Sequence, residues 1–243
     1  MDRYLIPDVN FILEPLHPFD APVNRMTFFD LFKTHRPPLI QQCLDDMNLM
    51  LETTHEMFTE ASAYLLVGEP LRIDLEAKDS VVNEKEQAVR RAVLEHVVID
   101  PQHELVFSLV LVSIVQDAER IGDLAKTLAE TAALAQGPRT EANIEALRDI
   151  RGHVAMMFEQ TRAAFIESDT ERARQVMAAN RETKTRVKAF LKRLAGQADL
   201  AGNEALVLGI AARVIGRTSS HLSNLASSVV LPFDQLRHED ESL

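Results

Sequence analysis

The position of the prolines limits the possible fold of this chain more than any other feature. Six of the ten prolines lie in the first 38 of 243 residues, and the other four are far apart. Proline ends or kinks a helix because it lacks the backbone N–H and its ring clashes with the preceding turn. We therefore predict an irregular N-terminal arm over residues 1–37, followed by long helices in an all-α fold.

After Pro38, apolar residues such as Cys43, Met47 and Leu51 recur at helical spacing. Glycines, prolines and capping signals set the expected helix ends, and Ser168 to Glu171 has the spacing of a capping box that opens the fifth helix. The six predicted helices cover residues 37–68, 71–98, 101–135, 140–166, 168–196 and 203–231.

Short breaks between long helices make neighbouring helices antiparallel. We therefore predict two antiparallel three-helix bundles in tandem, over residues 38–138 and 139–232, with a charged, disordered tail over 233–243. A shift of 97 residues places Arg120 on Arg217 and Leu128 on Leu225, which supports an internal duplication.

Composition excludes several classes of protein. A net charge of -11 argues against a general nucleic-acid binder, and the lone Cys43 excludes an intramolecular disulfide and a cysteine-rich metal site. The longest apolar run, residues 105–115, is about half of a membrane span, and the N-terminus lacks the pattern of a secretory signal. We expect a soluble, cytoplasmic protein without membrane insertion, in which Cys43 is a buried packing residue.

An acidic pair on the third predicted helix is the strongest candidate site. Glu119 and Asp123 are one turn apart, where like charges repel slightly, and Gly122 between them lowers helix propensity. Two such carboxylates can bind one cation. Asp79, Asn83 and Glu86 follow helical spacing on the second helix and could converge on the same ion, although the spacing by itself favours a solvated acidic face.

The stretch DAERIGDLAKTLAE, residues 117–130, closely resembles the signature helix of the PhoU family of phosphate-uptake regulators. Residues 77–86 are similar to the second helix of that family, and the resemblance extends over about residues 39–230. It implies a non-enzymatic negative regulator of phosphate-starvation signalling, which contacts a phosphate ABC transporter ATPase or a sensor histidine kinase and forms a homo-oligomer. It also implies a divalent or transition metal (Fe, Zn, Mg or Mn) held by Asp79, Asn83, Glu119 and Asp123.

The second half of the chain departs from the family pattern. Gly216 stands where the pattern of the first half has Glu119, and Ser220 stands where it has Asp123. Asn180 and Lys184 likewise take the places of Asp79 and Asn83. Lysine repels a cation and serine binds hard cations poorly, so we expect at most one metal cluster, on the first repeat.

Two other functions fit parts of the sequence. Glu52 and His55 form one Glu-x-x-His copy of the kind found in di-metal bundle enzymes, such as ferritin-like oxidases, but a second copy at Glu14 is interrupted by Pro15. A metal-free helical adaptor is the other alternative. His153 could be a phosphorelay histidine, although a structural histidine fits better, and the small-residue face over 215–228 would suit a dimer.

Overall fold

The computed structural model describes residues 38–99, 105–137 and 139–236. The predicted N-terminal arm, the predicted helix start at Asp100 and the predicted tail beyond residue 236 lie outside these residues. Within the described ranges the chain forms six long helices and no strand, which confirms the all-α prediction. The helices are α1 (Pro38–Val67), α2 (Leu75–Ile99), α3 (Leu105–Ala133), α4 (Glu141–Glu167), α5 (Thr170–Ala195) and α6 (Gly202–Val230), with a short 3-10 turn, η2 (Phe233–Gln235), after them.

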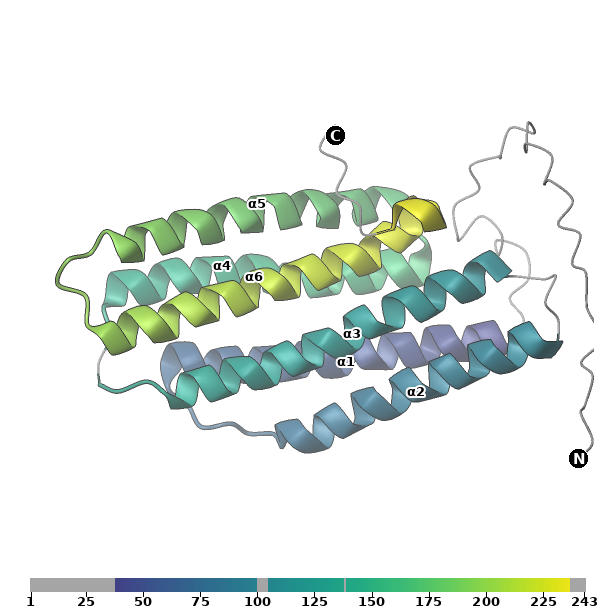
Figure 1. The fold of residues 1–243 in the computed structure, drawn as a ribbon, viewed down its shortest axis with the longest axis horizontal. Coiled ribbons are helices and arrows are strands. Elements are labelled where there is room, and N and C mark those ends of the chain that lie inside the picture. Colours follow the sequence, from purple (N-terminus) through teal and green to yellow (C-terminus); the bar gives the residue numbers. More distant parts are fainter. Residues whose placement is uncertain (1–37, 100–104, 138, 237–243) are drawn as a thin grey trace, which may run out of the picture.

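The helices run along the long axis of an elongated molecule as two antiparallel three-helix bundles (Figure 1). Helices α1, α2 and α3 pack on one another, and so do α4, α5 and α6. The two bundles meet where α3 packs on α6 and α1 packs on α4, so that α2 and α5 lie on the outside. A solvent-facing groove lies between α5 and α6 in the second bundle.

Two helix starts differ from the sequence prediction because an aspartate that was not predicted as a cap lies just before each helix. Helix α2 begins at Leu75, four residues later than predicted, because the Asp74 carboxylate accepts hydrogen bonds from the backbone N–H groups of Glu76 and Ala77 (3.0 and 3.1 Å). Asp169, not Ser168, caps α5 by accepting from the Arg172 N–H at 2.9 Å. Ser168 instead ends α4 in the left-handed conformation, with φ 57°.

The core is built mainly from aliphatic residues, methionine and a few phenylalanines, as the scarcity of aromatics in the sequence requires. Phe58, Met47 and Leu51 are buried on α1, and burial of such side chains supplies about 1.5–3 kcal/mol each. Cys43 is buried as predicted, and burial followed by the nearby Asp46 charge raises the pKa of its thiol to about 11, so it stays protonated.

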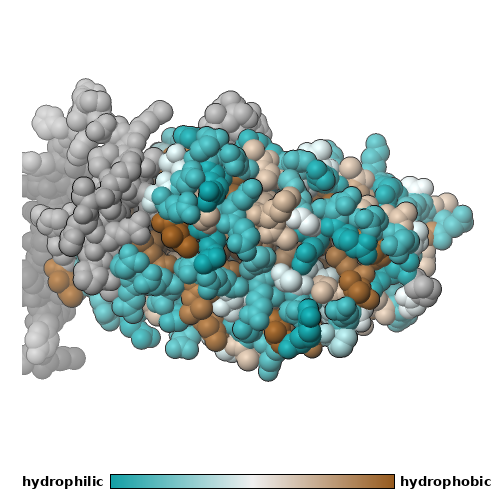
Figure 2. All heavy atoms as spheres, turned by 180° about the vertical axis from the view of Figure 1, so that it is seen from behind, coloured by the Kyte–Doolittle hydropathy of each residue, from teal (hydrophilic) through white to brown (hydrophobic). Residues whose placement is uncertain are grey.

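The outer surface is mostly hydrophilic, and its hydrophobic residues are scattered in small patches on the face seen from behind (Figure 2). Across the described ranges, no helix combines the length and the apolar character that a bilayer crossing requires. The small-residue face of α6 that suggested a dimer is buried inside the chain, where Thr218, Ser219 and Ser223 face neighbouring helices. That face is therefore not available to a second copy.

Candidate functional site

Asp79, on α2, is a buried carboxylate that faces α3. Only 5 % of the residue is exposed, and its Oδ2 accepts hydrogen bonds from Lys126 Nζ at 2.7 Å and from Asn83 Nδ2 at 3.1 Å. The other oxygen, Oδ1, is buried and has no hydrogen-bond partner among the residues that the structure describes. A buried carboxylate oxygen normally has a partner, so this one marks a place where a further donor or cation would be stabilised.

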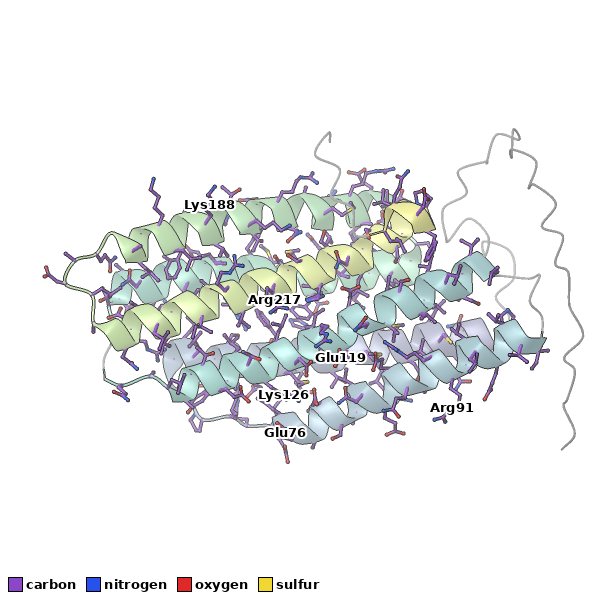
Figure 3. All side chains as sticks on the ribbon, viewed as in Figure 1. Glu76, Arg91, Glu119, Lys126, Lys188 and Arg217 are labelled. Atoms are coloured by element: carbon purple, nitrogen blue, oxygen red, sulfur yellow. The ribbon has the colours of Figure 1, made fainter. Side chains whose placement is uncertain are left out.

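Asp79 on α2, Glu76 on α2 and Asp123 on α3 form an acidic region. Lys126, on α3, is the cation at its centre. Its Nζ lies 3.8 Å from both Asp123 Oδ1 and Glu76 Oε2, in addition to its short contact with Asp79 (Figure 3 labels Lys126, Glu76 and Glu119). Burial opposes the charged form of Lys126, but the hydrogen bond and the charge of Asp79 outweigh it and raise its pKa. The structure thus places an ammonium group where the sequence analysis placed a metal ion.

Glu119 and Asp123 lie one turn apart on α3, at the edge of the same region. Burial, and then the charge of Asp123, raise the pKa of Glu119, while Arg120 lowers it and Glu86 on α2 adds a smaller increase. Arg120 contacts both carboxylates, with Nε 3.6 Å from Glu119 Oε2 and Nη1 3.4 Å from Asp123 Oδ2. The acidic pair is therefore partly neutralised from the solvent side.

The structure brings together most of the predicted metal ligands. Asp79 is bonded to Asn83, and Asp79 and Asp123 share the Lys126 ammonium. In the part of the chain that the structure describes, however, no three His, Cys, Asp or Glu side chains are arranged as a metal-binding group. The predicted metal site stays a prediction.

Gly122 lies directly against the unpartnered oxygen of Asp79. A methyl group at this position would be 3.5 Å from Asp79 Oδ1 and 3.6 Å from Thr54 Cγ2, which are ordinary contacts. Close packing of helices therefore does not require glycine here. The absence of a side chain at Gly122 leaves Asp79 Oδ1 without a methyl contact from α3.

The second repeat has an uncharged version of the same contact. Asn180, on α5, is buried, and its Oδ1 accepts hydrogen bonds from the hydroxyls of Ser219 at 2.9 Å and Ser220 at 3.4 Å. Ser219 is 97 residues after Gly122, and Asn180, which aligns roughly with Asp79, makes a similar contact from α5 to α6. An amide and two hydroxyls replace the carboxylate and the ammonium.

Asp117 is a functional candidate that the sequence analysis missed. It is 3 % exposed on α3, and its Oδ1 lies 2.8 Å from His221 Nδ1 and 2.9 Å from Asn224 Nδ2, both on α6. This network links the two bundles. The available signal was its helical register, because Asp117 lies between Ile114 and Ile121 on the apolar face of α3.

The residues that suggested other functions have partners within the chain. Glu52 pairs with Arg162 Nη2 at 2.6 Å, and His55 Nδ1 lies 3.3 Å from Glu159 Oε1. His153 Nε2 lies 3.2 Å from the Ala179 carbonyl oxygen, which agrees with a structural histidine. These contacts join helices to one another and give no support to a di-metal centre around His55.

Comparison with known proteins agrees with the helical-bundle fold described above. Residues 47–132 match the family model described as the PhoU domain. No curated protein matches the chain. A crystal structure of PhoU from Pseudomonas aeruginosa superposes with a TM-score of 0.73 at 21% identity, covering 79% of this chain and 95% of that one.

A second solved structure, the phosphate transport system regulatory protein PhoU from Streptococcus pneumoniae, gives a TM-score of 0.65 at 16% identity. It covers 79% of this chain and 91% of the other. At these identities the superpositions show a shared fold, and the family match over α1 to α3 identifies the first repeat. Residues 47–132 therefore match the PhoU domain, and about four fifths of the chain shares the fold of PhoU proteins.

Proposed function

We propose that this chain is a regulator of phosphate uptake and of phosphate-starvation signalling. The observation that carries the proposal is the PhoU domain over residues 47–132, which includes the acidic region between α2 and α3. The similarity in fold to PhoU proteins over 79% of the chain supports it. In this proposal the chain acts in the cytoplasm as a repressor of the starvation response.

The regulator would act through protein contacts and without catalysis. Its partners would be the ATPase of a phosphate ABC transporter, a sensor histidine kinase, or both, which is where the PhoU resemblance points. The outer helices α2 and α5 each leave one long side unpacked, which gives two surfaces for such partners. A homo-oligomer also stays a prediction, and its interface would have to lie away from the buried face of α6.

The acidic region would hold a divalent cation in competition with Lys126. Carboxylate and amide oxygens of Asp79, Asn83, Glu119 and Asp123 suit a hard cation. Two features support this fit, namely the unpartnered Asp79 Oδ1 and the raised pKa of Glu119, whose ionised form a bound cation would stabilise. Because the Lys126 ammonium already contacts Asp79, we expect weak binding that strengthens when Lys126 is neutralised.

Elemental analysis of purified protein tests the cation site. The chain should bind Mn²⁺ or Zn²⁺ under equilibrium dialysis, the Glu119→Gln/Asp123→Asn double variant should lose it, and Lys126→Met should bind more tightly. Equal metal content in all three proteins would count against the site. A di-iron absorption band with turnover of a reductant would support the alternative of a di-metal enzyme, while no metal and unchanged thermal stability after chelation would support a metal-free adaptor.

Affinity purification tests the partner. A tagged chain recovered from phosphate-replete cells should enrich the ATPase of a phosphate transporter or a sensor kinase, relative to an unrelated helical bundle with the same tag. Recovery of neither protein, with the bait folded and abundant, would contradict the proposed mode of action.

A further inference from the structure

A basic groove lies between α5 and α6 on the second repeat. Its cavity has a volume of about 410 Å³, and four cationic side chains line it together with Val187, Leu191, Gly216 and Ser220. No acidic side chain lines this groove among the residues that the structure describes. The cations are Lys184 and Lys188 on α5 and Arg213 and Arg217 on α6 (Figure 3 labels Lys188 and Arg217).

The groove occupies the place that the acidic region has in the first repeat. The shift of 97 residues that pairs Gly122 with Ser219 also puts Gly216 at the position of Glu119 and Ser220 at that of Asp123. Asn180 on α5 bonds to Ser219 on α6, much as Asp79 on α2 lies against Gly122 on α3. At Gly216 and Ser220 the second repeat has therefore lost the carboxylates of the first, and the groove around them is basic.

The accumulation of positive charge is unexpected in a chain whose net charge is -11. Helix α5 carries eight Lys or Arg residues against two Glu. Within each helix the two groove cations are spaced i, i+4, about 6 Å apart along the axis, where like charges destabilise a helix slightly. The side chains of Lys188, Arg213 and Arg217 form no ion pair with the described residues. An anion bound among them would relieve their mutual repulsion.

We infer that this groove binds a soluble oligophosphate, a ligand with at least two linked phosphate groups. Arginine presents a planar fork that matches two phosphate oxygens, and lysine adds a compact charge. Two of the cations lie on α5 and two on α6, and the members of each pair are about one helical turn apart, so they offer charge at several points of the groove. A chain of linked phosphates can extend along the groove, and the Ser220 hydroxyl can donate a further hydrogen bond.

Isothermal titration calorimetry of the full chain with sodium tripolyphosphate tests the inference. The buffer should contain about 0.15 M salt, to screen distant charges, and no divalent cation, because tripolyphosphate chelates them. The test variant is Lys188→Gln/Arg217→Gln, and the control, Arg91→Gln/Arg174→Gln, removes the same charge at exposed positions outside the groove. Circular dichroism of each variant checks that the helices are intact.

We expect one tripolyphosphate per chain, weaker binding of orthophosphate, and at least about tenfold weaker tripolyphosphate binding in the test variant than in the control. No saturable binding, or equal losses in both variants, would overturn the inference. Binding to phosphatidylglycerol vesicles without binding to tripolyphosphate would also overturn it, in favour of a membrane surface. The measurement uses purified protein and stands or fails separately from the proposed role in phosphate regulation.

Discussion

Lys126 on α3 donates a 2.7 Å hydrogen bond to the buried carboxylate of Asp79 on α2, and so supplies a positive charge inside the acidic region of the PhoU domain. The lysine side chain is 22% exposed and the aspartate 8%. The pair joins the outer helix α2 to α3. Its ammonium group also occupies a position where a metal ion would bind to Asp79. Its removal therefore has consequences for stability and for cation binding.

Replacement of Lys126 by methionine should lower the free energy of unfolding at pH 7 by about 1–3 kcal/mol, because it leaves a buried carboxylate without its cation. Asp79→Asn combined with Lys126→Met should recover much of the loss, since the double variant buries no unpaired charge. Urea denaturation of the four proteins in this cycle measures the coupling.

The exposed pair of Lys78 with Glu56, at 2.6 Å, is the matched control. Lys78→Met should cost less than about 1 kcal/mol, because both partners are substantially solvated. Equal losses for Lys78→Met and Lys126→Met would show that burial of Asp79 does not matter.

Glu119→Gln should stabilise the protein at neutral pH and have little effect in acid. The pKa of Glu119 is raised in the folded state, by burial and then by Asp123, so folding favours its protonated form. Its contribution is fully present below the usual glutamate pKa and is lost as pH rises through the folded-state pKa. Unfolding free energies at pH 7 and pH 4 should show a gain of about 0.5 kcal/mol at pH 7 only, and a loss at pH 7 would contradict the assignment.

Glu204→Gln should show the opposite dependence on pH. Burial opposes ionisation of Glu204 on α6, but hydrogen bonds from the Thr140 backbone N–H (2.8 Å) and Asn143 Nδ2 (3.2 Å) outweigh it and lower its pKa. The charged group caps the start of α4, so its loss should cost about 1 kcal/mol at pH 7. That cost should disappear as pH falls through the lowered pKa, and a cost independent of pH would rule out a role for the charge.

Gly122→Ala should leave the fold intact yet weaken cation binding. The added methyl would make only ordinary contacts, the closest at 3.5 Å to Asp79 Oδ1, and alanine favours a helix by up to about 1 kcal/mol. The same methyl would occupy the space beside the oxygen that has no partner among the described residues, where a cation would bind. Thermal unfolding with and without Mn²⁺ should show a smaller shift for this variant than for Gly209→Ala, whose methyl meets only Leu191 at 3.9 Å. An equal shift in both variants would separate Asp79 from any cation site.

Sequence periodicity was sufficient for the helices because each buries a continuous apolar stripe, as Met47 and Leu51 do on α1. It was insufficient at helix ends, where the carboxylates of Asp74 and Asp169 accept hydrogen bonds from the first backbone N–H groups of α2 and α5. A choice between adjacent caps depends on the path of the loop, which local sequence does not specify.

The acidic pair could be predicted from spacing, but its neutralisation could not. The contact between Lys126 and Asp79 joins residues 47 positions apart and depends on how α2 and α3 are aligned lengthwise. The same is true of Asp117, which is over 100 residues from His221 and Asn224. Its place among apolar residues indicated burial, but only the packing of α3 on α6 shows which residues it meets.

A phosphate-starvation reporter in cells that lack this chain tests the central claim most directly. In phosphate-replete medium, we expect deletion to switch the reporter on, and we expect expression of the intact chain to switch it off again. A reporter that stays off in the deletion strain, while still responding to phosphate starvation in the parent, would contradict the account.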